Sequence, residues 1–229
     1  DNWNRVARYL TPHYQVIIPD LPGQGDSKAP NDFDYSIPNL TEKLRRFAEA
    51  IQVEKDLHIA GHSMGGAISL LYAAQYPIDA KSLFLVNSAG VFKSANTPYL
   101  KDPNLLRNFV VAKPGDFDRL FKIAAQLPPF IPNELKVEQE KLMISNAANT
   151  SKLIEQLILM SKSFTPDTFA IAARSIDQPT LIVWGDKDQI IKPETVNLIK
   201  KIIPQAQVIM MPEIGHVPMI EAVEQTADD

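Results

Sequence analysis

The 229-residue sequence contains no cysteine. This absence excludes disulfide bonds, thiolate catalysis and zinc sites built on cysteine. An excess of positive charge is missing too, since 27 acidic residues outnumber 23 Lys and Arg residues and give a net charge of −4. Neither nucleic acid nor an anionic membrane surface is therefore indicated as a partner. The apolar runs are no longer than a strand, so no transmembrane segment is predicted.

What is present is typical of a globular domain, with 45% hydrophobic and 22% charged residues. Short apolar runs predict strands at 14–19, 57–60, 82–86, 180–184 and 207–211. Helical periodicity predicts helices at 3–10, 41–51, 64–75 and 194–202. Strands that are almost continuously apolar and alternate with helices indicate an α/β fold, with a mostly parallel, doubly wound sheet covered on both faces.

The strand pattern stops between residues 89 and 177. This stretch instead predicts helical segments, divided by prolines, at 104–112, 116–126, 134–147, 150–162 and 167–175. Because the chain leaves one strand of the sheet here and returns to another, we predict a helical cap over residues 91–163. The α/β core is then discontinuous and comprises residues 1–90 and 164–229.

The segment Gly61-His62-Ser63-Met64-Gly65 is a G-x-S-x-G motif between a predicted strand and a predicted helix. A sharp turn in this context projects a serine hydroxyl above the end of the sheet, as a nucleophile requires. We expect the flanking glycines to prevent collisions with the adjoining strand and helix. We also expect the backbone N–H of Met64 to donate to a developing oxyanion. The sequence thus predicts Ser63 as the nucleophile.

A serine nucleophile needs a base within hydrogen-bond reach, and the chain has four histidines. We expect His13 to lie at the surface, His58 to pack within its strand, and the His62 side chain to point away from Ser63. His216 follows the last predicted strand in a loop, which is where open α/β sheets place their sites. His216 is therefore the predicted general base and acid.

Two carboxylates follow the strand at 180–184, and both Asp186 and Asp188 are candidates for the acid that orients the base. Spacing favours Asp188 slightly, because it lies one loop turn further and reaches the next loop. Asp186 is equally typical of a turn residue that binds its own backbone. Asn87 and Ser88 occupy the other position for an acid, after the strand at 82–86. The order Ser63, Asp188, His216 matches that of α/β hydrolases.

Four segments together carry a family resemblance, namely Asp20-Leu21-Pro22-Gly23-Gln24-Gly25-Asp26-Ser27, Gly61-His62-Ser63-Met64-Gly65-Gly66, Trp184-Gly185-Asp186-Lys187-Asp188 and Gly215-His216. They resemble the α/β-hydrolase superfamily, and most of all its capped lipase and esterase branch. The resemblance implies that Asp188, the aspartate of G-x-x-D, is the acid. It also implies that Gly23 and Gly25 shape a loop near the active site through their backbone geometry.

The sequence departs from this family at its start, because it opens Asp1-Asn2-Trp3 without the His-Gly strand and glycine-rich loop that normally precede the first helix. That loop supplies the second oxyanion donor, which we therefore expect upstream of Asp1. The strand normally lies between the segments at 15–19 and 57–60. We expect a preceding segment of the same protein to complete the sheet, and a targeting signal would lie there.

Apolar side chains in the predicted cap favour an apolar acyl or alcohol group. They are Phe109, Phe117, Phe121, Leu127, Phe130, Ile131, Leu157, Leu159 and Met160. The leading hypothesis is a lipase or esterase acting on a small-molecule ester or lipid, with no cofactor and no metal. A serine elbow argues against dehalogenases and epoxide hydrolases, which use aspartate there. Carbon–carbon bond hydrolases, perhydrolases and a non-catalytic binding protein remain alternatives.

Overall fold

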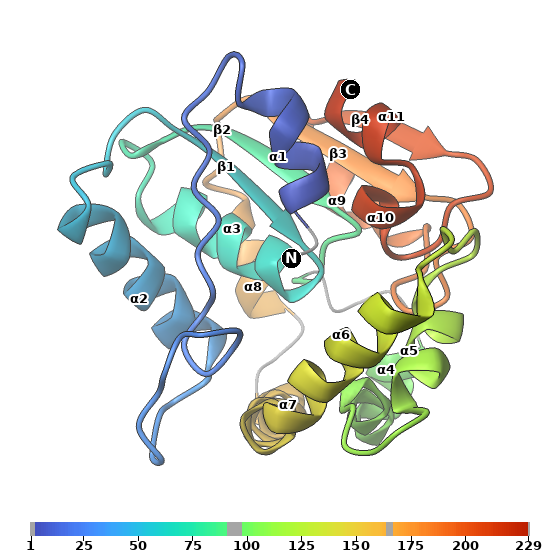
Figure 1. Cartoon of the computed structure of the whole chain (residues 1–229). Helices are drawn as coiled ribbons and strands as arrows, with labels where there is room; N and C mark the ends of the chain where they lie inside the picture. The colour runs from blue at the N-terminus through green and yellow to red at the C-terminus, as the bar shows by residue number, and fades with distance from the viewer. Residues whose placement is uncertain (1–2, 91–97, 164–166, 229) are drawn as a thin grey trace.

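The structure, a computed structural model, describes residues 3–90, 98–163 and 167–228. Four parallel strands form one sheet in the order β1-β2-β3-β4, with bounds Leu57–His62, Ala80–Val86, Thr180–Gly185 and Gln207–Met211. Gly61 pairs with Leu85 of β2, and Gly185 pairs with Met211 of β4. The carboxyl ends of all four strands therefore meet along one edge, where the following loops lie side by side (Figure 1).

Helices connect and cover these strands. The core helices are α1 (Asn4–Leu10), α2 (Ile37–Ala50), α3 (Met64–Gln75), α8 (Asp167–Ala173), α9 (Thr195–Ile202), α10 (Pro218–Glu221) and α11 (Val223–Asp228). The segment between β2 and β3 adds α4 (Pro98–Lys101), the 3-10 helix η1 (Pro103–Phe109), α5 (Asp116–Ala124), α6 (Asn133–Ser145) and α7 (Ala147–Ser163). Residues 98–163, called the insert below, contain no strand and gather at one end of the sheet (Figure 1).

Alternating side chains of the sheet supply two hydrophobic cores. Ile182 and Trp184 of β3 pack on one face with α3, α8 and α9, whereas Val183 packs on the other face with α1 and α10. All three side chains are fully buried. The doubly wound α/β fold predicted from the sequence is thus confirmed, since both faces of a parallel sheet need a covering layer.

The strand predicted at 14–19 is wrong. Residues 15–20 have no assigned secondary structure, and none of the described backbone hydrogen bonds pairs them with β1. Apolar runs form strands only where a neighbour accepts the ladder of hydrogen bonds. Ile17 and Ile18 instead remain 39% and 40% exposed. The helix predicted at 41–51 begins earlier, at Ile37, because the Ser36 side chain accepts from Asn39 N–H and caps it.

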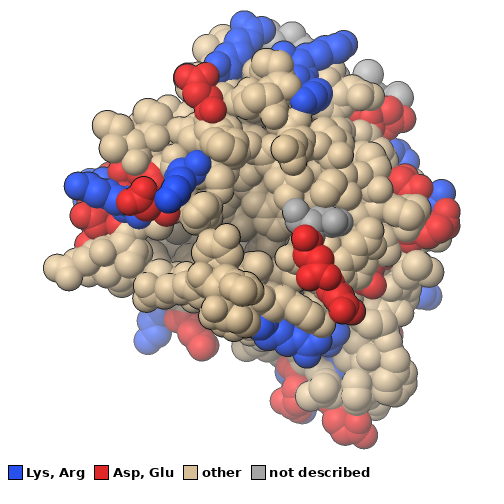
Figure 2. All heavy atoms as spheres, turned by 90° about the horizontal axis from the view of Figure 1, so that it is seen from above, with Lys and Arg blue, Asp and Glu red and all other residues tan. Residues whose placement is uncertain are grey.

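The helices of the insert match the predicted segments closely, except that the segment predicted at 104–112 is the 3-10 helix η1 ending at Phe109 and that α4 was not predicted. The predicted domain boundaries at 90/91 and 163/164 adjoin residues 91–97 and 164–166, which lie outside the described residues. Within the described ranges, no helix has the length and apolar character needed to cross a membrane. On the face drawn in Figure 2, acidic and basic side chains lie beside one another, and neither sign covers the face alone.

Candidate active site

Ser63 joins β1 directly to α3 in a strained turn. Its backbone has φ 51° and ψ −120°, and a non-glycine residue in such a conformation costs about 1–3 kcal/mol. Two contacts with the end of β2 hold the turn: Ser63 N–H donates to the carbonyl of Val86 (3.2 Å), and Ala89 N–H donates to the carbonyl of Ser63 (2.9 Å). The structure therefore forms the strand–turn–helix elbow that the motif predicts.

The glycines around the elbow differ in whether a side chain would fit in their place. A Cβ on Gly61 would lie 2.3 Å from the carbonyl oxygen of Gly65, and a Cβ on Gly66 would lie 2.1 Å from Oγ of Ser88. A Cβ on Gly65 would meet nothing within 4 Å. The expectation that both flanking glycines prevent collisions is thus confirmed for Gly61 and wrong for Gly65. The crowded partner on the helix side is Gly66.

His216 and Asp188 form a buried pair beyond β4 and β3. His216 Nδ1 lies 2.8 Å from Oδ2 of Asp188, and the two residues are 4% and 0% exposed. Because an ionised carboxylate only accepts hydrogen bonds, Nδ1 of a neutral His216 carries the proton. Nε2 is then the ring nitrogen that can take a proton from another group. The pair supplies the geometry of a base with its orienting acid.

The environment of Asp188 keeps it ionised. Burial alone would raise its pKa, but the charge of His216 and hydrogen bonds from His216, Asn87 and a backbone N–H together hold the pKa below its ordinary value. Oδ1 accepts from the N–H groups of Ile190 (2.8 Å) and Ile191 (3.0 Å), and Oδ2 accepts from Nδ2 of Asn87 (2.7 Å). Both carboxylate oxygens are therefore fixed.

Asn87 contacts Asp188 and belongs to the site. The sequence interpretation noted only that Asn87 is not an acid and therefore does not compete with Asp188. Nδ2 of Asn87 also donates to the carbonyl of Gly215 (3.2 Å), so one amide joins the loops that carry Asp188 and His216. Asn87 adopts φ 42°, and it lies fully buried directly after β2. The sequence signal that could have indicated Asn87 is a polar residue at the carboxyl end of a strand.

Asp186 has a different role. Its Oδ1 accepts from the N–H of Glu213 (2.7 Å), and Oδ2 lies 3.7 Å from Nζ of Lys187. The Asp186 side chain is 35% exposed. Asp186 therefore joins its loop to the loop after β4, instead of binding the backbone of its own turn as the alternative expected, while Asp188 is the carboxylate in contact with His216.

His62 lies against His216, although the sequence interpretation gave it no part in the site. Its Nε2 lies 2.6 Å from the carbonyl oxygen of His216, and the two ring centroids are 4.7 Å apart. Burial of the ring, and then the nearby charge of His216, lower the pKa of His62 to about 3. The ring is thus neutral, and its Nε2–H donates to the His216 carbonyl. Adjacency to the nucleophile in the sequence gave no hint of this contact.

Of the other two histidines, His13 is exposed, as expected. The expectation that His58 packs is wrong, because His58 is exposed in β1, where its Nδ1 lies 2.7 Å from Oγ of Ser82. The loop after residue 19 also has the backbone geometry implied by the resemblance, since Gly23 and Gly25 adopt φ 78° and 51°. A Cβ on Gly23 would lie 2.2 Å from the hydroxyl of Tyr35.

The insert contributes apolar contacts near the site. Tyr99 of α4 stacks on Phe109, with ring centroids 5.0 Å apart, and burial followed by the charge of Asp188 raises the pKa of Tyr99. Phe117 and Phe121 also stack, and Phe117 is buried. Several of the apolar side chains named in the predicted cap are exposed, namely Leu127 (53%), Phe130 (90%) and Leu159 (60%).

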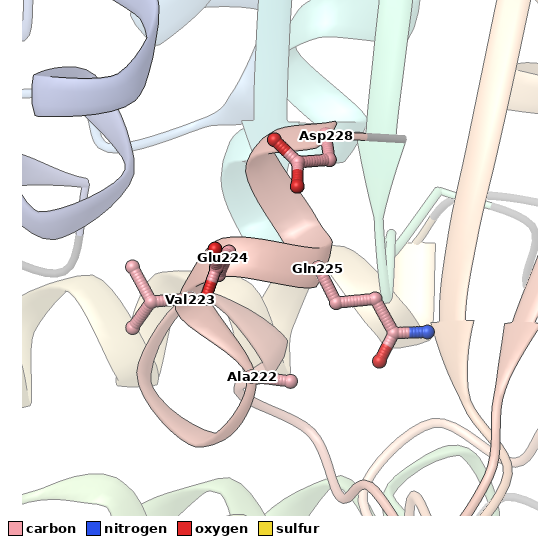
Figure 3. A pocket seen from close by; sticks show the side chains of 5 residues that line it. All are labelled: Ala222, Val223, Glu224, Gln225 and Asp228. Carbon is pink, nitrogen blue, oxygen red and sulfur yellow. The ribbon is translucent and has the colours of Figure 1, made fainter.

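A hollow with a volume of about 570 Å³ lies at α11 rather than at this site (Figure 3). It is lined by Ala222, Val223, Glu224, Gln225 and Asp228. None of the residues that surround Ser63, Asp188 or His216 lines it, so we assign it no part in the chemistry. No group of three or more His, Asp or Glu side chains in the described ranges is placed to hold a metal ion.

The model of a family described as the alpha/beta hydrolase fold matches residues 1–223. The chain belongs to the α/β-hydrolase family. Its sequence is 45% identical to "Lipase 1" of Psychrobacter immobilis and 44% identical to "Lipase 3" of Moraxella sp. (strain TA144), and each match covers 100% of this chain and 71% of the relative. This α/β hydrolase is therefore a member of the lipase and esterase branch, as the sequence resemblance predicted.

A solved structure agrees with this placement. The crystal structure of a candidate lipase from Acinetobacter baumannii AYE superposes with a TM-score of 0.97 at 54% identity and covers 100% of this α/β hydrolase and 77% of that chain. Within this fold, Ser63, Asn87, Asp188 and His216 follow the carboxyl ends of four neighbouring strands, and hydrogen bonds link Asn87 and His216 to Asp188, whereas none of the described hydrogen bonds joins the Ser63 hydroxyl to His216. These side chains can activate a hydroxyl, receive its proton and stabilise the resulting imidazolium.

Proposed function

We propose that this chain hydrolyses carboxylic esters through a covalent acyl-enzyme on Ser63. His216 is the general base and acid, and Asp188 orients it. The observation that carries this proposal is the buried pair of His216 and Asp188, held at the same edge of the sheet at which the Ser63 elbow turns into α3. The relatives named as lipases agree with this chemistry, and fold alone would not have assigned it.

In the first half of the reaction, Ser63 Oγ attacks the ester carbonyl carbon while its proton passes to Nε2 of His216. The negative charge that develops on the carbonyl oxygen is stabilised by the backbone N–H of Met64. This N–H lies in the first turn of α3, where helical N–H groups have no intrahelical acceptor. Collapse of the tetrahedral intermediate breaks the bond to the alcohol oxygen, which takes the proton from His216. The acyl group stays on Ser63.

In the second half, water replaces the alcohol. His216 takes a proton from the water as its oxygen attacks the acyl carbon, and the proton then returns to Ser63 Oγ as the carboxylic acid leaves. Asp188 stays ionised throughout and stabilises the imidazolium, which agrees with the direction of its pKa shift. No cofactor or metal is needed for either half.

An ester with an apolar acyl group is the proposed substrate, for example a short- to medium-chain ester or a monoacyl glyceride. The insert contains two pairs of stacked aromatic rings, Tyr99 with Phe109 and Phe117 with Phe121. Tyr99, Phe109 and Phe121 belong to the hydrophobic cluster that also contains Ile214 and Val217, on either side of His216. Apolar walls of this kind favour acyl chains over charged groups. We propose that the insert is the cap that selects the acyl chain.

A series of p-nitrophenyl esters of increasing acyl length tests this function. We expect turnover that Ser63→Ala abolishes and that Ser145→Ala, a change at an exposed serine of α6, leaves intact. A fluorophosphonate should label the parent chain and the Ser145 variant but not the Ser63 variant. Absence of both turnover and Ser63 labelling in a folded chain would refute the proposal.

We also propose that a further strand, from a preceding segment of the same protein, pairs with the outer edge of β1. In the described part of the chain β2 is the only strand that pairs with β1, and His58 and Ala60 of β1 are exposed. An unpaired strand edge is a template for another strand. Such a segment would supply the second oxyanion donor upstream of Asp1. A natural protein with an intact mass of 25.5 kDa and full activity would contradict this.

A further inference from the structure

Glu221, the last residue of α10, gathers backbone N–H groups from two distant parts of the chain. From the insert, its Oε2 accepts the N–H groups of Gln126 and Leu127, each at 2.7 Å. From the loop that carries His216, its two oxygens accept Gly215 N–H at 3.0 and 3.1 Å. Oε1 also accepts Val217 N–H at 3.3 Å. One carboxylate therefore joins the insert to the loop of the proposed base.

A second contact joins the same two segments. The N–H of His216 donates to the carbonyl of Ala124 at the end of α5, at 2.7 Å. The backbones approach so closely that a Cβ on Gly215 would lie 2.7 Å from both the carbonyl of Ala124 and the nitrogen of Gln126. A glycine before His216 is therefore needed for this close approach.

The chemistry of the junction requires an acceptor-only group at position 221. Every partner of the Glu221 oxygens is a backbone N–H, and an ionised carboxylate accepts from all of them at once. Hydrogen bonds to a charged acceptor are about twice as strong as those between neutral groups. An amide would present an NH₂ group in place of one oxygen, so it would lose either the Oε2 contacts with Gln126 and Leu127 or the Oε1 contacts with Gly215 and Val217.

We propose that Glu221 is a positioning residue for the hydrolysis, which fastens the loop of His216 to the insert. The alignment of the His216 imidazole between Asp188 and Ser63 then depends on the position of the insert relative to the loop that carries His216. This inference rests on the proposed function, and it adds a residue that touches neither the ester nor the reacting atoms. Misplacement of a catalytic group by about 1 Å costs roughly 10²-fold in rate, so a loosened loop has a measurable effect.

The test compares Glu221→Gln with Glu224→Gln, a matched change of an exposed carboxylate in the next helix. We expect E221Q to lower kcat roughly tenfold or more with little change in KM, because the acyl site is intact and the base is displaced. Phosphonylation of Ser63 by a fluorophosphonate should slow by a similar factor. E224Q should match the parent chain in both. Thermal unfolding gives the folded fraction, to which each rate is normalised.

Hydrogen exchange measured by mass spectrometry reports the junction itself. We expect faster exchange in E221Q for peptides covering residues 124–128 and 213–217, and unchanged exchange elsewhere. If E221Q does not fold, Glu221→Asp replaces it, since it keeps the charge but is one methylene shorter, and a smaller loss of kcat is expected. Parent-like kcat and exchange in the variant would overturn the role of Glu221, whereas an inactive parent chain would instead overturn the proposed function.

Discussion

The buried imidazole of His62 makes stability depend on pH in a window that the structure defines. The pKa of His62 is lowered to about 3 in the folded chain, against about 6.5 in an unfolded one. Between these values the unfolded chain binds a proton that the folded chain excludes. The contribution of the neutral His62 ring to the free energy of unfolding is therefore fully present above about pH 6.5 and decreases as the pH is lowered toward 3. At pH 5, which is 1.5 pH units below 6.5, the loss is at most about 2 kcal/mol.

The perturbation is His62→Gln, which removes the titrating ring and keeps an N–H donor for the carbonyl of His216. Urea unfolding of the parent chain and the variant at pH 7.5 and pH 5.0 gives four free energies of unfolding. We expect the parent chain to lose about 2 kcal/mol more than H62Q on acidification. The pH of 5.0 lies above the ordinary carboxyl pKa values, so acidic side chains contribute little to the difference.

His13→Gln is the matched control, because His13 is exposed. This variant should lose as much stability as the parent chain between the two pH values. The reasoning would be refuted if H62Q and the parent chain lost equal stability within about 0.5 kcal/mol, because the ring would then titrate alike in folded and unfolded chains. Equal loss would also remove the argument that His62 donates to His216 as a neutral ring.

Two further predictions use matched pairs within the site. Asp188→Asn should lower kcat by roughly 10³–10⁴-fold in the ester assay, because the amide no longer fixes the Nδ1–H tautomer, while Asp186→Asn should leave kcat within about threefold. Similar losses for both variants would contradict the assignment of the acid. Gly66→Ala should lower the free energy of unfolding by about 1–3 kcal/mol through collision with Ser88, whereas Gly65→Ala should keep or raise it by up to about 1 kcal/mol. Urea unfolding measures the free energy of unfolding of both variants, and equal changes would contradict the collision argued for position 66.

The parts of the fold that sequence predicted correctly are those with strong local signals. The apolar runs of β1 to β4 and the charge-free helix after Ser63 are continuous patterns, and each became the expected element. The segment at 15–19 has the same apolar pattern but no described neighbour, so it formed no strand. Strand formation depends on a partner distant in sequence, which a local pattern does not contain.

The candidate site divides in the same way. Ser63 and His216 could be predicted because each follows a strand in a distinctive motif, and the choice between Asp186 and Asp188 needed the family resemblance. His62, Asn87 and Glu221 were missed, because their roles consist of contacts with residues that are distant in the sequence or with backbone groups. Motifs record the groups that do chemistry, whereas the groups that hold them are recorded only in the folded arrangement.

The peptide groups on both sides of the His216 side chain are engaged by separate parts of the molecule. Its N–H binds the insert at Ala124, and its carbonyl accepts from His62, 154 positions earlier in the chain. Contacts of such long range form late in folding, because large loops must close before they contribute. The placement of the base therefore depends at once on β1, on the insert and on the loop after β4. Hydrolytic competence is in this sense a property of the whole fold and not of one motif.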